Sequence, residues 1–149
     1  MSGGSRAILG GGLLAGILDI TAAFVFYGLR GVPPIRILHS IASGLLGPAA
    51  SKGGLATAAL GLLLHFVIAL GWAVVYYVLS RRLPVLSRRA ILSGMAYGVA
   101  VYFLMNLVVL PLSAIPKRPF SIDPVMVVIH MACVGLPIAL AVRRWAPKT

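Results

Sequence analysis

Acidic residues are almost absent from this sequence. Asp19 and Asp123 are the only two in 149 residues, against 13 lysines and arginines, so the net charge is +11. Only 10% of the residues are charged and 60% are hydrophobic, so the chain lacks the polar surface that a soluble domain of this length requires. These shortages indicate an integral membrane protein, and we expect residues 1–149 to form a single membrane domain.

Cysteine is also scarce, because Cys133 is the only one, and this excludes an internal disulfide. The sequence lacks the G-x-S-x-G, P-loop and C-x-x-C motifs and has no paired carboxylates, so we do not expect an enzyme. We expect no metal and no cofactor. His65 and His130 are predicted at depths that differ by about 6 Å, which is awkward for two axial ligands of one haem iron.

Four apolar segments are long enough to cross about 30 Å of hydrocarbon as helices. We place these spans at residues 7–29, 55–80, 90–112 and 123–142. The predicted fold is therefore all-α, a polytopic membrane protein built as a four-transmembrane-helix bundle.

Basic residues gather at the ends of these spans. This pattern is typical of topology signals and of contacts with anionic lipid headgroups, so the expected partners are the lipid bilayer and those headgroups, and no nucleic acid. Eight fall on the side of both termini and five on the other, which predicts that the N- and C-termini are cytoplasmic. The eight are Arg6, Arg81, Arg82, Arg88, Arg89, Arg143, Arg144 and Lys148, and the five are Arg30, Arg36, Lys52, Lys117 and Arg118.

The first outer loop contains a further predicted helix, at residues 33–46. A proline at its start suits the first helical turn, and Gly47-Pro48 ends it. Arg36 and His39 share one face with two serines, while leucine and isoleucine fill much of the rest. The segment is too short to span, so we expect it to lie in the outer membrane interface.

Each span carries a stripe of small and polar residues, which we expect to face the interior of the bundle. Glycines in these stripes allow close helix packing; they are Gly12, Gly16, Gly61, Gly94 and Gly98. At about 1.5 Å per residue, Asp19 and His65 lie near the middle of the membrane, and Asn106 and His130 lie roughly 9–10 Å from its outer surface. With Arg36 and His39 above them, these residues predict a polar column that opens outward.

Asp19 is the most unusual of these residues. A charged aspartate at the bilayer centre costs at least about 2.5–3.5 kcal/mol, unless it is protonated or paired. We hypothesise that His65 is its partner, because it is the only titratable group predicted at the same depth. Alternatively, Asp19 is a packing residue that holds the bundle together.

Two functions are compatible with this pattern. The first is the binding or conduction of protons, a small anion or a lipid headgroup through the outward-facing polar cavity, with Asp19 and His65 as the inner gate. The second is a non-catalytic structural or accessory subunit, which packs through its glycine faces against a membrane protein partner or further copies of itself.

Two stretches resemble a known family. LLLHFVIALGWAVVYYVLSRRLP, then a third span that closes on proline, then SAIPKRPFSIDPVMVVIHM, resemble the YagU-like family of small bacterial inner-membrane proteins. The resemblance covers approximately the last 90 residues. It implies the membrane class and topology, and the family's loose association with acid tolerance implies proton handling. The matching positions are His65, Pro84, Pro111, Pro119 and His130.

Overall fold

The computed structural model of the chain describes residues 1–117 and 119–146, and it contains no strand within those residues. Arg118 and Lys148, counted above among the basic residues, lie outside this part. Four helical segments are long and apolar enough to cross a membrane, which fits an integral membrane protein. They are Gly3–Gly28, Gly54–Arg82, Ala90–Leu112 and Pro124–Trp145. The sequence placed each of them to within four residues at either end.

The first two of these segments are the single helices α1 (Gly3–Gly28) and α3 (Gly54–Arg82). The third consists of α5 (Ala90–Leu104), the π-helical turn η2 (Met105–Val109) and α6 (Leu110–Leu112). The fourth consists of α7 (Pro124–Ile129), the π-helical turn η3 (His130–Gly135) and α8 (Leu136–Trp145). Three shorter elements connect them, namely α2 (Pro34–Leu46), the 3-10 helix η1 (Gly47–Lys52) and α4 (Val85–Arg88).

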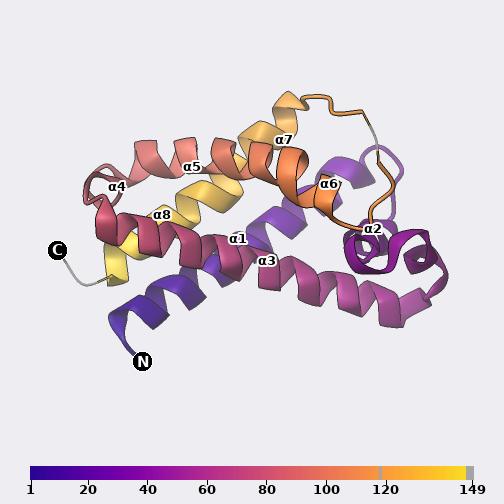
Figure 1. Cartoon of the computed structure of the whole chain (residues 1–149), viewed down its shortest axis with the longest axis horizontal. Coiled ribbons are helices and arrows are strands. Elements are labelled where there is room, and N and C mark those ends of the chain that lie inside the picture. The colour runs from indigo at the N-terminus through magenta and orange to yellow at the C-terminus, as the bar shows by residue number, and fades with distance from the viewer. Residues whose placement is uncertain (118, 147–149) are drawn as a thin grey trace.

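By their contacts, the four long segments follow one another in the order α3, α1, fourth segment, α5. In the view of Figure 1, α3 crosses α1. Helix α1 packs against α3 on one side and against α8 and η3 on the other, and α5 packs on η3 and α8. Although α3 and α5 follow each other in the sequence, they are not packed side by side along their lengths. The start of α1 and the ends of α3 and α8 meet at one end of the molecule, where Tyr77 lies against Gly4 and Trp145 lies against Gly10.

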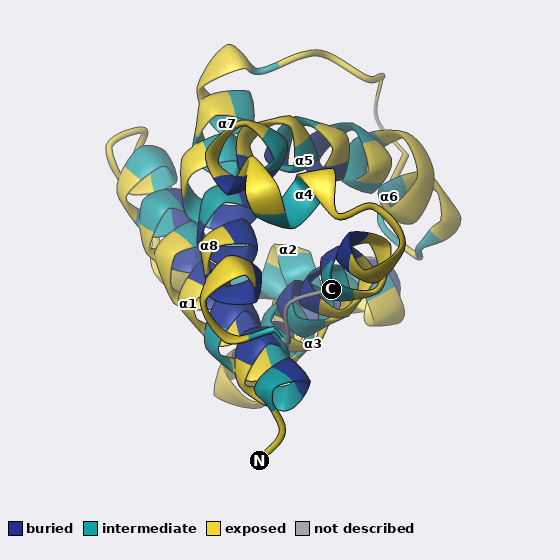
Figure 2. Ribbon diagram, turned by 90° about the vertical axis from the view of Figure 1, so that its left-hand side faces the viewer, coloured by how far each residue is buried: buried dark blue, intermediate teal, exposed yellow. Residues whose placement is uncertain are grey.

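The core between these helices is made mainly of small side chains. Alanines such as Ala7, Ala15 and Ala73 are fully buried, and Tyr76 and Ile138 are among the few large side chains with them. The outward faces carry exposed leucine, valine and isoleucine. Figure 2 colours the exposed residues of the ribbon yellow. Small residues inside and large apolar residues outside are the pattern of helices that pack closely in lipid.

Glycines bring the helices into contact at backbone distance. A Cβ atom at Gly12 would lie 3.0 Å from the Cα of Leu70, so α1 and α3 meet there. At Gly98 it would collide with the carbonyl of His130, so α5 lies directly on the backbone of η3. The other predicted packing glycines have equally close neighbours; these are Phe66 for Gly16, Leu38 for Gly61, and Ala139 and Gly135 for Gly94.

Both π-helical turns come just before a proline. The N–H of Leu110 donates to the carbonyl of Met105, and the N–H of Leu136 donates to that of Met131. In each case the next residue is proline, Pro111 or Pro137, which has no N–H and clashes with the carbonyl four residues earlier in an α-helix. A wider turn relieves this clash. It also adds one residue to the turn, so residues on its two sides no longer follow one α-helical face.

Candidate functional site

Asp19 lies deep in the interface between α1 and the fourth segment. It is nine residues from the end of α1, or about 14 Å along the axis, and shares a face with Ala15 and Gly11, which lies against Ile138 of α8. The side chain as a whole is half-buried, but its Oδ1 atom is fully buried and has no hydrogen-bond partner. Asp19 is within electrostatic range of Cys133 in η3. A buried carboxylate oxygen without a partner is energetically costly, so it requires an explanation.

His65 does not provide that partner. Its Nε2–H donates to the backbone carbonyl of Gly16, at an N–O distance of 2.8 Å. No hydrogen bond or ion pair joins it to Asp19 within the residues that the structure describes. The pairing hypothesis is therefore wrong. The N–H of His65 instead reaches the backbone of α1 one turn before Asp19, where Gly16 has no side chain and leaves its carbonyl open to α3.

Asn106 and His130 bind within their own segments. The Nδ2 of Asn106 donates to the carbonyl of Tyr102, and the Nδ1–H of His130 donates to that of Met126, each at 2.8 Å. Both acceptors are four residues earlier in the chain. Neither side chain is hydrogen-bonded to Asp19 or His65, so the expected layers are not joined into a hydrogen-bonded column.

Tyr102 is the residue at this end that sequence reasoning did not single out. Its ring stands edge-on to that of His130, with 5.5 Å between centroids, and its hydroxyl accepts the N–H of Asp123 at 2.9 Å. Asp123 in turn caps α7, because its Oδ1 accepts the N–H groups of Val125 and Met126. The only sequence signal for Tyr102 is its position in the four-residue spacing that runs from Gly94 to Asn106.

The two predicted site residues of α2 also act separately. The Nε2–H of His39 donates to the carbonyl of Gly54 at 2.8 Å and so fixes α2 to the start of α3. Arg36 is exposed. Neither residue reaches Asp19 by a hydrogen bond.

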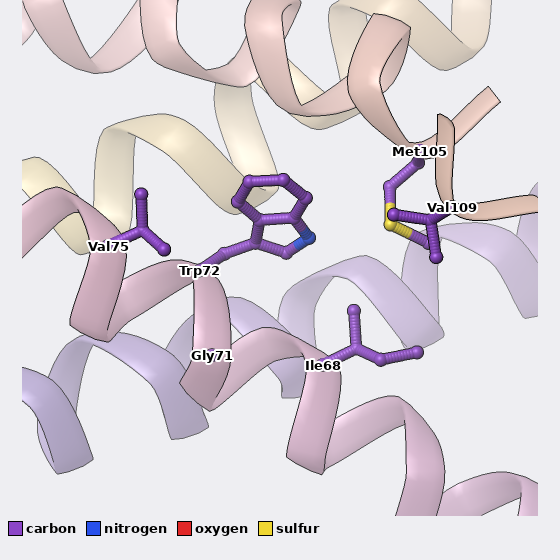
Figure 3. Close-up of a pocket in the computed structure, with 6 residues that line it drawn as sticks. All are labelled: Ile68, Gly71, Trp72, Val75, Met105 and Val109. Atoms are coloured by element: carbon purple, nitrogen blue, oxygen red, sulfur yellow. The ribbon is translucent and has the colours of Figure 1, made fainter. Parts of the chain in front are cut away.

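Two hollows stand out, and none of the six predicted site residues lines either of them. The first, of about 270 Å³, is an apolar groove between α3 and η2, where Ile68 and Trp72 face Met105 and Val109 (Figure 3). The second lies beside arginines at the turn between α3 and α5. The structure thus places an apolar groove where α3 and α5 diverge, and Asp19 in a separate helix interface.

No family of proteins, no curated protein and no solved structure matched this chain. Within residues 1–117 and 119–146, no three histidine, cysteine, aspartate or glutamate side chains lie close enough together to hold a metal ion. The buried Oδ1 atom of Asp19 is therefore the feature of this site that points to a function.

Proposed function

We propose that this chain is a small, non-enzymatic protein of the bacterial inner membrane that binds a proton at Asp19 and moves it within the bilayer. The observation that carries the proposal is the Oδ1 atom of Asp19, which is buried between two membrane-length helices without a hydrogen-bond partner. Packing alone does not account for such a group, because polar residues that hold membrane helices together do so by bonding across them.

A carboxyl group can carry a proton because its neutral form removes the cost of a buried charge. An ionisable side chain inside a membrane span is a candidate proton or ion site for this reason. A small anion is disfavoured as the ligand, because an ionised carboxylate would repel it.

The proposed setting is a four-helix bundle with both termini in the cytoplasm and α2 in the outer membrane interface. Two features support it. The start of α1 and the ends of α3 and α8 meet at the end of the molecule that carries the larger set of basic residues. At the opposite end, α2 packs on α3 and exposes Ile35 and Leu45.

Membership of the YagU-like family belongs to the same proposal. It rests on the pattern of His65, Pro84, Pro111, Pro119 and His130 in the sequence. The family's association with acid tolerance agrees with a proton site, and it adds no residue to the site beyond those already described.

Proton flux through vesicles tests the proposal. We expect purified protein in liposomes to dissipate an imposed pH gradient, and Asp19→Asn to abolish this flux. The matched control is Asp123→Asn, which removes the other carboxylate while an amide oxygen can still cap α7. Equal flux through the wild type and Asp19→Asn would overturn the proposal, and so would equal loss in both variants.

The groove between α3 and η2 favours a second candidate, the accessory subunit. Gly71 on its wall has no atom within 4 Å of a Cβ position, so a helix from another protein has room to approach α3 there. In this case Gly71→Trp should release a co-purifying membrane partner. Gly28→Trp, at another open glycine, should leave it bound. A partner retained by both variants would exclude the groove as its binding site.

A further inference from the structure

Three arginines line the second hollow of the structure, which is open to the surface and has a volume of about 280 Å³. Arg88 ends α4, Arg89 lies in the turn that follows, and Arg143 belongs to α8, more than fifty residues away in the sequence. The remaining lining comes from the first turn of α5, at Ala90, Ile91 and Leu92. The fold thus brings three positive charges from two distant segments to one cavity.

The positive charge of this cavity has no internal counter-charge among the described residues. The side chains of Arg88, Arg89 and Arg143 are exposed and form no hydrogen bond or ion pair within that part of the chain. The two acidic side chains are elsewhere, since Asp19 is in the middle of α1 and Asp123 caps α7 at the opposite end of the molecule. The described residues therefore leave these three guanidinium groups available to bind an anion.

The geometry of the cavity favours an anionic oxygen ligand such as phosphate. A guanidinium group binds two oxygens of a phosphate at once, and three such groups line this open hollow. The start of α5 contributes as well, because no side chain caps its first N–H groups.

The surroundings of the cavity are apolar on the side of the helices. Ile91 is 55% exposed and Leu92 66% exposed, and both are at the start of a segment long enough to span a membrane. A ligand that fits both parts has an anionic head beside the arginines and a hydrocarbon tail along α5. Basic pockets between membrane helices bind the headgroups of anionic lipids in this way.

We propose that Arg88, Arg89 and Arg143 form a binding site for the phosphate group of an anionic phospholipid, whose acyl chains lie along Ile91 and Leu92. The site is independent of Asp19, so the failure of one proposal leaves the other standing. It also differs from general attraction to the membrane surface, because it involves three particular arginines out of the thirteen basic residues.

Lipid titration of the purified protein in detergent, followed by native mass spectrometry, tests this site. The probes are phosphatidylglycerol, zwitterionic phosphatidylcholine and inorganic phosphate. We expect bound phosphatidylglycerol at low lipid concentration and no comparable binding of phosphatidylcholine. The variant Arg88→Gln/Arg89→Gln/Arg143→Gln should weaken the binding of phosphatidylglycerol about tenfold or more, as expected for the loss of several charged hydrogen bonds.

The matched control is Arg6→Gln/Arg82→Gln/Arg144→Gln, which removes the same charge from the same end of the molecule but outside the cavity lining. It should retain nearly full binding. If both triple variants lose binding equally, the attraction is general and the site is refuted. If inorganic phosphate binds as tightly as the lipid, the acyl chains contribute nothing and the lipid assignment is refuted. Should the triple variant not fold, Arg143→Gln alone must still weaken binding relative to Arg144→Gln.

Discussion

The imidazole of His65 in α3 donates a hydrogen bond to the backbone carbonyl of Gly16 in α1, across 2.8 Å. The two residues are 49 positions apart in the sequence. The bond is possible because Gly16 has no side chain, so the backbone of α1 is open to α3 at this point. The carbonyl of Gly16 is at membrane depth, where an additional donor from a neighbouring helix joins two spans directly.

Replacement of His65 by leucine should weaken the association of α1 with α3. We expect a loss of about 0.6–1.7 kcal/mol in the free energy of unfolding, the range measured for polar contacts between membrane helices. His130→Leu is the matched control, since His130 binds a carbonyl of its own segment. Unfolding in mixed detergent micelles measures both. Equal losses would show that the bond to Gly16 adds nothing specific to the α1–α3 contact.

Gly98→Ala should destabilise the protein strongly. The added methyl group would collide with the carbonyl of His130 and the Cα of Met131, both backbone atoms that cannot rotate away. Overpacking of this kind costs about 1–3 kcal/mol. Gly71→Ala is the control, because nothing lies within 4 Å of its Cβ position and alanine favours a helix by up to about 1 kcal/mol. Thermal unfolding should rank Gly71→Ala at or above the wild type and Gly98→Ala below both. A Gly98→Ala variant as stable as Gly71→Ala would contradict the packing described for η3.

Tyr97→Phe should loosen the contact between α3 and α5. The hydroxyl of Tyr97 donates to the carbonyl of Trp72 at 2.7 Å, and its ring stands edge-on to that of Tyr76. Removal of the hydroxyl should lower the free energy of unfolding by about 0.5–1.5 kcal/mol. It should also widen the distribution of distances between spin labels on α3 and α5. The hydroxyl of Tyr27 has no hydrogen-bond partner within the described residues, so Tyr27→Phe should leave both quantities unchanged. An unchanged distance distribution in Tyr97→Phe would mean that other contacts hold the two helices together.

Asp19→Leu should raise the stability of the protein while it removes the proton flux. The substitution replaces the carboxyl group, whose Oδ1 atom is buried without a partner, by an apolar group of similar shape, and the expected gain in the free energy of unfolding is about 1–3 kcal/mol. A residue retained at a cost in stability is expected at a functional site. Thermal unfolding of the two proteins in the same detergent measures the difference. A marked loss of stability would instead show that Asp19 holds helices together, and would support the structural alternative.

The helices themselves were predictable from the sequence. Apolar length predicted the four long segments, and proline and glycine marked both ends of α2. These features depend only on neighbours in the chain, so composition and spacing are enough to find them.

The partners of the polar residues were not predictable in the same way. Depth along a helix placed Asp19 and His65 at one level, but level alone does not say which face of α1 each neighbour occupies. The face that each neighbour occupies depends on which helices pack together, and the lengths of the connecting loops do not determine this. The π-helical turns before Pro111 and Pro137 add to the difficulty, because each shifts the following residues away from the face that α-helical spacing predicts.

The contact between Trp72, Tyr76 and Tyr97 has a mechanical consequence. It joins α3 to α5 near the α4 turn, and beyond it the two helices diverge around the apolar groove. The angle between α3 and α5, and with it the width of the groove, is therefore set by the glycine contacts that connect these two helices through α1 and the fourth segment.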